Sequence, residues 1–316
     1  MNIGILGTSE IAFRRFLPAV KTIRDIASIG IASRDVSKTK KFTESFGCNP
    51  YQSYDDLLSD PLIEAVYIPL PPALHFSWAK KALLSGKHVF LEKPSTTAYK
   101  DTEELIHIAE SQKLVLHENY MFLYHSQLDF IQKLLLEKVI GDLRLITIRF
   151  GFPKRGTSDF RYNKELGGGA LLDCGGYTIR LATVLSGKTL GLISANLCFD
   201  DLAVDLYGSA SLKNEKGLSV QIAFGMDNFY KCELEIWGSN GCITAPRIFT
   251  APPDFEPLIT ILTNEKSETV TLPPNDQFAG SIKKFISAVN DNIERKQLYS
   301  DLLFQSKLVD EVSNFK

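Results

Sequence analysis

NIGILGTSEIA, at residues 2–12, is the stretch of sequence that decides the fold. Residues 2–6 form a short apolar run typical of a buried strand, and Gly7 permits a tight turn directly after it. The apolar residues that follow, Ile11, Phe13 and Phe16, recur at helical spacing. The stretch therefore predicts a strand, a glycine turn and a helix, with Pro18 kinking that helix.

The same alternation of strand and helix continues to about residue 120. Further strands are expected at 26–32, 65–68, 88–91 and 114–117, and helices at 36–46, 74–84 and 101–112. A parallel strand is reached only through a crossover, so this order predicts a doubly wound parallel sheet with helices on both faces. We expect residues 1–120 to form a dinucleotide-binding domain.

The pattern changes after residue 120. One helix at 127–137 is followed by apolar runs separated mostly by polar turns, and two helices end the chain, at 277–290 and 301–314. The runs are 143–150, 190–199, 203–212, 218–224, 232–237, 258–262 and 268–272. Successive strands with short turns predict an α/β domain with a large, open, mostly antiparallel sheet, over 121–316.

Composition narrows the class of protein. The chain has 316 residues, 44% of them hydrophobic, which suits two globular domains. With 35 Lys and Arg against 37 Asp and Glu, no general basic field would hold a nucleic acid or a membrane surface. No apolar run approaches the roughly 18 residues of a spanning helix, and MNIGILG is unlike a secretory signal. We therefore expect a cytoplasmic protein.

Cysteine and histidine spacing gives no indication of a metal site. The five cysteines are odd in number and far apart, without a C-x-x-C pair. The five histidines all lie between His75 and His125, and none has the spacing that places two imidazoles on one helix face. We expect reduced thiols and catalysis without a metal.

The glycine turn has the form G-x-S-x-x-A, from Gly7 to Ala12. A small residue at Ser9 lets the backbone approach a pyrophosphate, and Ala12 lets the helix pack closely on the strand. A plain turn without a ligand is the alternative. Because the turn follows the first strand and opens a helix, we predict that it binds the cofactor through Gly7, Thr8, Ser9, Glu10, Ile11 and Ala12.

Ser33 and Arg34 follow the second expected strand, where such folds contact the adenosine ribose. A hydroxyl and a guanidinium suit a 2′-phosphate, which favours NADP, as NADPH, over NAD. The alternative is a solvated Arg34, with Asp35 as a first-turn acid of the next helix.

Two further segments carry groups suited to proton and hydride chemistry. Glu92-Lys93-Pro94 follows the expected strand 88–91, at the sheet edge where ligands bind. GGGALLDCGGY, at 167–177, places Asp173 and Tyr177 four residues apart on one expected helix. A tyrosine that faces a lysine can protonate a developing alkoxide. A solvent-facing Lys93 and a packed Tyr177 are the alternatives.

Together these motifs, with PLPPALH at 69–75, resemble the Gfo/Idh/MocA oxidoreductases. Further phrases resemble the family's branch of 3-ketoreductases for dTDP-linked deoxysugars: AVYIPLPPALH (65–75), ENYMFL (118–123), FGMDNFY (224–230), RIFTAPP (247–253) and DQF (276–278). Many members carry His where Tyr177 stands, whereas this branch carries Tyr. That departure favours ketone reduction with a tyrosine acid.

The resemblance implies a Rossmann domain, a C-terminal α/β domain, and a nicotinamide held between them with Lys93 near its reacting end. It also implies that Leu70, His75, Glu92, Arg161 and Asp173 lie on the cofactor side. Tyr230 and Thr250 would face the substrate together with Lys93 and Tyr177.

We therefore expect NADPH-dependent reduction of a C3 keto group on a nucleotide-linked deoxysugar, with Lys93 and Tyr177 as catalytic residues. Oxidation of a free sugar, polyol or cyclic diol by the same groups is an alternative. A cofactor-binding regulator without turnover is an alternative from another class. The exposed face of an open sheet suggests a homodimer or homotetramer.

Overall fold

The computed structural model describes residues 1–156 and 158–315. The chain forms two compact units. The first contains Met1–Asn119 and Phe278–Ser306, and the second contains Tyr120–Gln277 and the chain from Lys307 onward. The units are described in turn.

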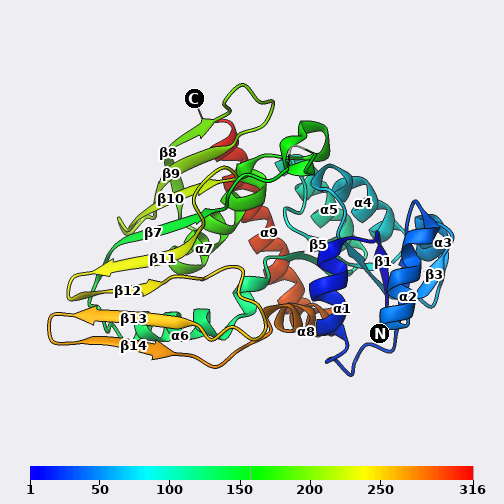
Figure 1. Cartoon of the computed structure of the whole chain (residues 1–316), viewed down its shortest axis with the longest axis horizontal. Coiled ribbons are helices and arrows are strands. Elements are labelled where there is room, and N and C mark those ends of the chain that lie inside the picture. The colour runs from blue at the N-terminus through cyan, green and yellow to red at the C-terminus, as the bar shows by residue number, and fades with distance from the viewer. Residues whose placement is uncertain (157, 316) are drawn as a thin grey trace. The chain divides into compact units, whose positions relative to one another are not determined.

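The first unit is built on a six-stranded sheet in which every pair of neighbouring strands is parallel (Figure 1). Its strands are β1 (Asn2–Leu6), β2 (Ser28–Ala32), β3 (Asn49–Tyr51), β4 (Ala65–Ile68), β5 (His88–Glu92) and β6 (Leu116–Asn119). The order is β3-β2-β1-β4-β5-β6, so the chain reverses its direction of travel between β1 and β4. This confirms the predicted doubly wound sheet, and ligands of such sheets bind at that reversal.

Helices cover both faces of this sheet. One face is packed against residues of α3, α4, α5 and α9, among them Leu57, Leu83, Leu105 and Leu302. The helices of the unit are α1 (Leu17–Val20), α2 (Lys40–Phe46), α3 (Tyr54–Ser59), α4 (His75–Leu84), α5 (Tyr99–Ser111), α8 (Gln277–Asn290) and α9 (Asn292–Ser313), the last of which continues into the second unit.

An aromatic core covers the other face. Phe16 stacks on Tyr67 with ring centroids 3.9 Å apart, and Phe90 packs edge-on against Tyr67 at 5.4 Å. Phe285 of α8 completes the group, edge-on to Phe90 at 5.4 Å and without exposed surface. The Ser281 hydroxyl, one turn earlier on α8, lies 2.9 Å from His117 Nε2.

The two C-terminal helices therefore belong to the core of the first unit. The sequence had placed every residue after 120 in one domain, whereas the contacts group Phe278–Ser306 with the parallel sheet. Tyr299 of α9 donates its hydroxyl to the Leu114 carbonyl, which ties this helix to the chain just before β6. No local pattern in the sequence reports such long-range packing.

The first helix begins with a wide turn. Residues Ala12–Phe16 are π-helical, and the Leu17 N–H bonds to the Ala12 carbonyl five residues back. Pro18 then stands in the first turn of α1. The structure thus places a π turn directly ahead of the proline.

The second unit holds an eight-stranded open sheet in the order β14-β13-β12-β11-β7-β10-β9-β8. The strands are β7 (Leu143–Gly151), β8 (Gly191–Cys198), β9 (Tyr207–Lys213), β10 (Ser219–Gly225), β11 (Lys231–Gly238), β12 (Gly241–Ala245), β13 (Leu258–Thr263) and β14 (Ser267–Thr271). Only β7 and β10 pair in parallel, which confirms the predicted, mostly antiparallel sheet. The helices are α6 (Ser126–Leu136) and α7 (Gly176–Ser186).

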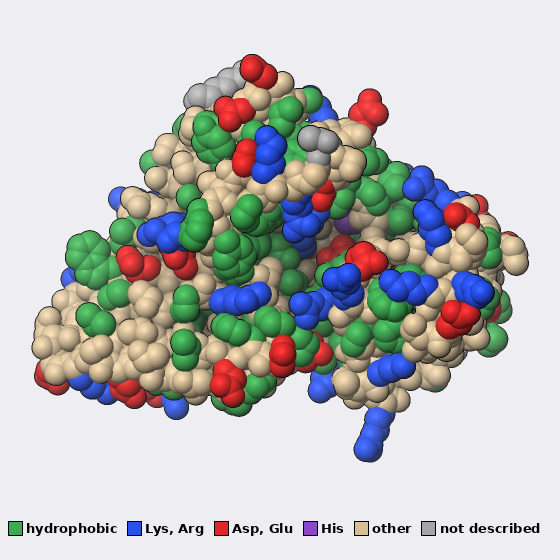
Figure 2. Space-filling model, in the orientation of Figure 1, with side chains coloured by type: hydrophobic (Ala, Val, Ile, Leu, Met, Phe, Trp, Pro, Cys, Tyr) green, Lys and Arg blue, Asp and Glu red, His purple; other side chains and the backbone are tan. Residues whose placement is uncertain are grey.

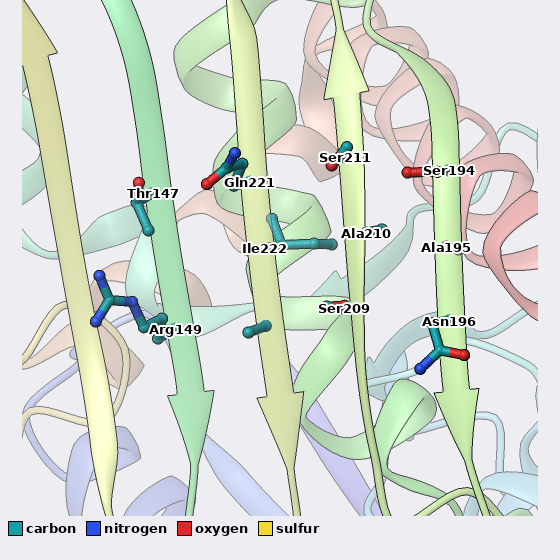
Figure 3. Close-up of a pocket in the computed structure, with 11 residues that line it drawn as sticks. Thr147, Arg149, Ser194, Ala195, Asn196, Ser209, Ala210, Ser211, Gln221 and Ile222 are labelled. Carbon is teal, nitrogen blue, oxygen red and sulfur yellow. The ribbon is translucent and has the colours of Figure 1, made fainter.

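The two faces of this sheet differ. In β11, buried residues alternate with more exposed ones, as expected for a strand with one covered face. The other face has a shallow hollow of about 530 Å³ over β8, β9, β10 and β7 (Figure 3). Hydroxyl and amide groups line it, including Thr147, Ser209, Ser211 and Gln221.

On the side of the molecule that Figure 2 displays, acidic and basic side chains are interspersed.

Within residues 1–156 and 158–315, no helix combines the length and apolar character needed to cross a membrane.

Replacing Phe285 by alanine tests the packing of α8 on the parallel sheet. Removing a fully buried ring leaves a cavity beside Phe90, so Phe285→Ala should lower the free energy of unfolding by about 3–5 kcal/mol. Urea titration followed by circular dichroism measures this quantity. Leu136→Ala, at a side chain 86% exposed on α6, is the control and should change it by about 0.5 kcal/mol or less. Equal effects of the two substitutions would contradict the packing.

Candidate active site

The first glycine turn has the geometry of a site that needs glycine. Gly7 has φ +111°, and a Cβ added there would lie 2.9 Å from Leu70 Cδ2. The Gly7 N–H bonds to the Ala32 carbonyl at 2.9 Å, and the Ala12 N–H bonds to Ser9 Oγ at 3.2 Å. The Glu10 carboxylate lies 2.7 Å from Arg14 Nε, so a cation offsets its negative charge. Because Gly7 has no side chain, a ligand can come close to the backbone of this turn, as binding of a pyrophosphate requires.

The end of β2 leaves a cation available for a phosphate. Ser33 is buried, and its hydroxyl lies 3.4 Å from Thr8 Oγ1. Asp35 turns into its own helix, where its carboxylate accepts hydrogen bonds from the Ser37 N–H at 3.1 Å and hydroxyl at 2.6 Å. The hydroxyl bond is the main reason that the pKa of Asp35 lies below its usual value. Arg34 forms no ion pair within the described part of the chain. Asp35, the acid that could repel a phosphate, is engaged by Ser37 instead.

Lys93 stands in a segment whose backbone is anchored on both sides. Before it, the Glu92 carboxylate accepts hydrogen bonds from the Tyr67 hydroxyl at 2.7 Å and Asn119 Nδ2 at 2.8 Å. Burial raises the pKa of Glu92, and these two bonds partly oppose that rise. After it, the Ser95 N–H donates to Glu118 Oε1 at 2.7 Å. The backbone around Lys93 therefore has little freedom to move.

His75 links this segment to the loop after β4. It has no exposed surface, and its Nδ1 and Nε2 lie 2.7 Å from the carbonyl oxygens of Pro94 and Leu70, respectively. Burial lowers its pKa to about 4, although both carbonyls favour the charged ring. Both nitrogens face backbone carbonyls, so His75 joins the loop after β4 to the segment around Lys93.

Arg161 and Asp173 of the second unit pair with each other. Arg161 Nε lies 2.6 Å from Asp173 Oδ2, and Arg161 Nη1 lies 3.1 Å from Asp159 Oδ1. Burial lowers the pKa of the Arg161 guanidinium, but the two carboxylates outweigh it and the pKa is raised. The resemblance places both residues on the cofactor side, and the pair presents them as one fixed unit.

Tyr177 lies among aromatic rings on α7. It is 5% exposed, and its ring centroid lies 5.2 Å from Tyr120, 5.2 Å from Phe150 and 5.5 Å from Phe249. Its hydroxyl contacts Met121 Sδ at 3.6 Å. Such packing fixes the ring and leaves the hydroxyl as its one group for proton transfer.

The helix that carries Tyr177 begins at a buried acid. The Asp205 carboxylate accepts a hydrogen bond from the Leu171 N–H at 2.7 Å. Gly169 has φ +120°, and a Cβ there would lie 2.4 Å from Asp205 Oδ1, which explains the third glycine of the motif. Residues Leu171–Gly175, including Asp173, are π-helical before α7 begins. Sequence analysis missed Asp205, because it lies 34 residues after Leu171, whose N–H it caps. A capping residue is recognised in a sequence only when it stands next to the helix.

The hydroxyls of Tyr230 and Thr250, which the resemblance places toward the substrate, lie 3.4 Å apart. Burial is the main cause of a raised pKa at Tyr230. The structure adds Arg247, whose Nη2 donates to the Thr250 carbonyl at 3.2 Å. Arg247 opens the phrase RIFTAPP, which carried part of the resemblance, but sequence analysis gave this residue no role of its own.

The predicted site residues thus form two groups, one in each unit. The first contains residues 7–12, Ser33, Arg34, Leu70, His75, Glu92 and Lys93, and the second contains Arg161, Asp173, Tyr177, Tyr230 and Thr250. Among the residues described, no three His, Cys, Asp or Glu side chains gather as a possible metal site.

Two family models match the chain. Residues 1–120 match the NAD-binding Rossmann fold of the Gfo/Idh/MocA oxidoreductase family, and residues 129–244 match the Gfo/Idh/MocA C-terminal domain.

Similar proteins include dTDP-3,4-didehydro-2,6-dideoxy-alpha-D-glucose 3-reductases. The one from Actinomadura kijaniata is 39% identical, over 99% of this chain and 94% of its own length. The one from Streptomyces violaceoruber is 40% identical, over 92% of this chain and 85% of its own length.

Solved structures agree with these relatives. A 3-ketoreductase from Actinomadura kijaniata, in complex with NADP and TDP-benzene, superposes with a TM-score of 0.96 at 39% identity, covering 100% of this chain and 97% of its own. An aldose-aldose oxidoreductase from Caulobacter crescentus has a TM-score of 0.87 at 20% identity, covers 99% of this chain and 96% of its own, and shares the fold. The chain therefore belongs to the Gfo/Idh/MocA family of oxidoreductases.

Proposed function

We propose that the protein is an NADPH-dependent reductase that converts the C3 keto group of a dTDP-linked deoxysugar to an alcohol. The observation that carries this proposal is the presence of Lys93, in an anchored segment, and Tyr177, in a rigid aromatic setting, in a chain 39% identical to such reductases. Residues 1–120 would bind the cofactor, and residues 121–316 would bind the sugar and join subunits.

The relative from Actinomadura kijaniata supports the choice of this pair. Its structures include one with a tyrosine replaced by phenylalanine and others with a lysine replaced by alanine or glutamate. Those two positions are separated by as many residues as Tyr177 and Lys93. The spacing supports the assignment of Lys93 and Tyr177 to the same two roles.

The cofactor fits the first unit. The open approach at Gly7 would receive the pyrophosphate, and Ser33 with Arg34 would bind the 2′-phosphate. When bound, NADPH supplies the hydride. Leu70 and the segment around Lys93, joined through His75, would hold the nicotinamide end.

Lys93 and Tyr177 would manage the charge that reduction builds on the ketone oxygen. A free tyrosine has a pKa of about 10, so Tyr177 carries its proton at neutral pH and can donate it to that oxygen. The Lys93 ammonium would stabilise the negative charge before the proton arrives. A lysine held by an anchored backbone needs little reorganisation for this task.

Oxidation of a free sugar or diol is the second candidate. A D-xylose 1-dehydrogenase (NADP(+)) from Haloferax volcanii is 28% identical over 92% of this chain and favours it. NADPH oxidation with a dTDP-linked 3-keto sugar, measured beside NADP⁺ reduction with free sugars and diols, distinguishes the two. Absence of turnover in both assays would favour a cofactor-binding regulator.

We also propose that the protein acts in the cytoplasm as a homodimer or homotetramer. The uncovered face of the eight-stranded sheet supports self-association, since Trp237 and Leu262 are 58% and 50% exposed there. Sedimentation equilibrium should give at least twice the mass of the 35.3 kDa chain. A mass equal to one chain at micromolar concentration would remove this part of the proposal.

Substitution of Arg34 tests cofactor choice. Loss of a charged hydrogen bond to the 2′-phosphate costs about 1.5–3 kcal/mol, so Arg34→Ala should weaken NADPH binding roughly ten- to a hundredfold. NADH binding should stay unchanged, because NADH lacks this phosphate. Fluorescence titration with both cofactors measures the effect, with the exposed Arg24→Ala as control. Equal losses for NADPH and NADH would show that Arg34 does not read the phosphate.

Substitution of Tyr177 tests the proton donor. Tyr177→Phe keeps the packed ring and removes the hydroxyl, so kcat for keto-sugar reduction should fall about 10²- to 10⁴-fold with little change in NADPH affinity. Lys93→Met should be at least as severe. Tyr99→Phe, on α5, is the control. If Tyr177→Phe kept kcat within a factor of about three while hydride transfer limits the rate, Tyr177 would be a packing residue.

A further inference from the structure

Four hydroxyl groups form a hydrogen-bonded cluster beside the segment that carries Lys93. Ser95 and Thr96 belong to that segment, and both side chains are buried. The Thr102 hydroxyl, on α5 and without exposed surface, lies 3.2 Å from Ser95 Oγ and 2.7 Å from Thr96 Oγ1. The Ser306 hydroxyl, on α9, donates to Thr102 Oγ1 at 3.1 Å. Thr102 therefore contacts each of the other three hydroxyls.

The number of hydroxyl protons fixes the direction of each bond in the cluster. The Ala98 carbonyl can only accept, so the Thr96 hydroxyl donates to it, at 2.7 Å. The contact between Thr96 and Thr102 therefore uses the Thr102 proton. Because Thr102 has no second proton, the Ser95 hydroxyl must donate to it, as the Ser306 hydroxyl does. Thr102 thus donates one hydrogen bond and accepts two.

Loss of the Thr102 hydroxyl would disturb the segment that carries Lys93. Ser95 would keep a buried proton without its acceptor, and Thr96 would lose a donor. Both side chains would have to turn toward new partners, and the backbone that joins them to Lys93 would move with them. Because a displacement of about 1 Å at a reacting group can cost roughly a hundredfold in rate, a small movement is sufficient to slow the reaction.

We propose that Thr102 is a positioning residue for the reduction: its hydroxyl holds Ser95 and Thr96, and through them it sets the place of Lys93. Thr102 acts through the proposed catalytic lysine and needs no contact with substrate or cofactor. The inference rests on the proposed function, which gives Lys93 its role, and adds to it a residue that belongs to none of the recognised motifs.

Removal of the Thr102 hydroxyl tests this role. Thr102→Val keeps the shape of the side chain, and kcat should fall about 10- to 100-fold while hydride transfer limits the rate, with NADPH affinity within about threefold. Thr102→Ser restores the hydroxyl and should keep kcat within about threefold of the unchanged protein. Thr39→Val is the control and should not change kcat, because the buried Thr39 hydroxyl donates to the Val36 carbonyl in its own turn.

Two serines provide a matched pair if Thr102→Val does not fold. Ser95→Ala and Ser306→Ala each remove one hydroxyl that donates to Thr102, but only Ser95 belongs to the segment of Lys93. Ser95→Ala should lower kcat several-fold, and Ser306→Ala should leave it within about twofold. Equal effects of the two substitutions on kcat would overturn the proposal.

A double-mutant cycle with Lys93 separates positioning from a general loss of stability. In a chain that already carries Lys93→Met, Thr102→Val should change the single-turnover rate by about twofold or less, because the group that Thr102 positions is gone. If Thr102→Val lowered the rate by the same factor with and without Lys93, it would act independently of that lysine and the proposal would be overturned.

Failure of this proposal can be told apart from failure of the proposed function. The cycle uses the reaction that the unchanged protein catalyses, so oxidation of a free sugar would remove the proposed function and leave the positioning role to be judged by the same rates. If neither reaction occurs, hydrogen exchange decides. The Ser95 amide, which is bonded to Glu118 Oε1, should exchange at least about tenfold faster in Thr102→Val than in Thr102→Ser. Equal exchange would overturn the positioning role.

Discussion

The partly buried carboxylate of Glu92 is the group on which much of the first unit depends. A carboxylate that loses part of its water needs hydrogen-bond donors from the protein, and Glu92 takes them from Tyr67 on β4 and Asn119 on β6. Asn119 in turn accepts a hydrogen bond from Ser281 on α8 at 2.8 Å. One acid thus joins the ends of three neighbouring strands and a returning helix, and Lys93 follows it directly in the chain. The backbone of Lys93, the proposed catalytic lysine, is therefore anchored through the residues beside it.

Much of the fold follows from local pattern, because strands and helices of ordinary length leave a periodic signal. The parallel sheet and most of the second sheet were predicted on that basis. Two strands were missed for physical reasons. β3 has only three residues, one of them Pro50, and β12 has five, beginning at Gly241. The path of α8 was missed as well, since Phe285 reaches its partner Phe90 only through tertiary packing.

The candidate site likewise contains residues that sequence motifs identified and residues that they did not. Residues recognised from motifs, such as Gly7 and Lys93, directly follow strands of the parallel sheet, which the sequence pattern predicts. The contacts that anchor such segments were not predicted. His75 was expected on the cofactor side, but its contacts with two backbone carbonyls were not, and Asp205, which accepts from a backbone N–H, was missed, because any residue supplies such backbone groups. Arg247 was quoted within RIFTAPP but received no role, because the sequence does not show which hydrogen-bond partners an arginine has; in the described chain its buried Nε has none. Residues that support a site through contacts with the backbone form no sequence motif, so a single sequence does not identify them.

The return of Phe278–Ser306 to the first unit also has a consequence for how the chain is made. The ribosome completes the parallel sheet early, but the helices that cover one of its faces and complete the other emerge almost last. The second unit, by contrast, has nearly all its residues between Tyr120 and Gln277. The first unit can therefore complete its packing only after the chain of the second unit has been made, unlike an N-terminal domain that is contiguous in sequence. The earliest part of the chain must wait, with Phe90 uncovered, until nearly the whole protein has been translated.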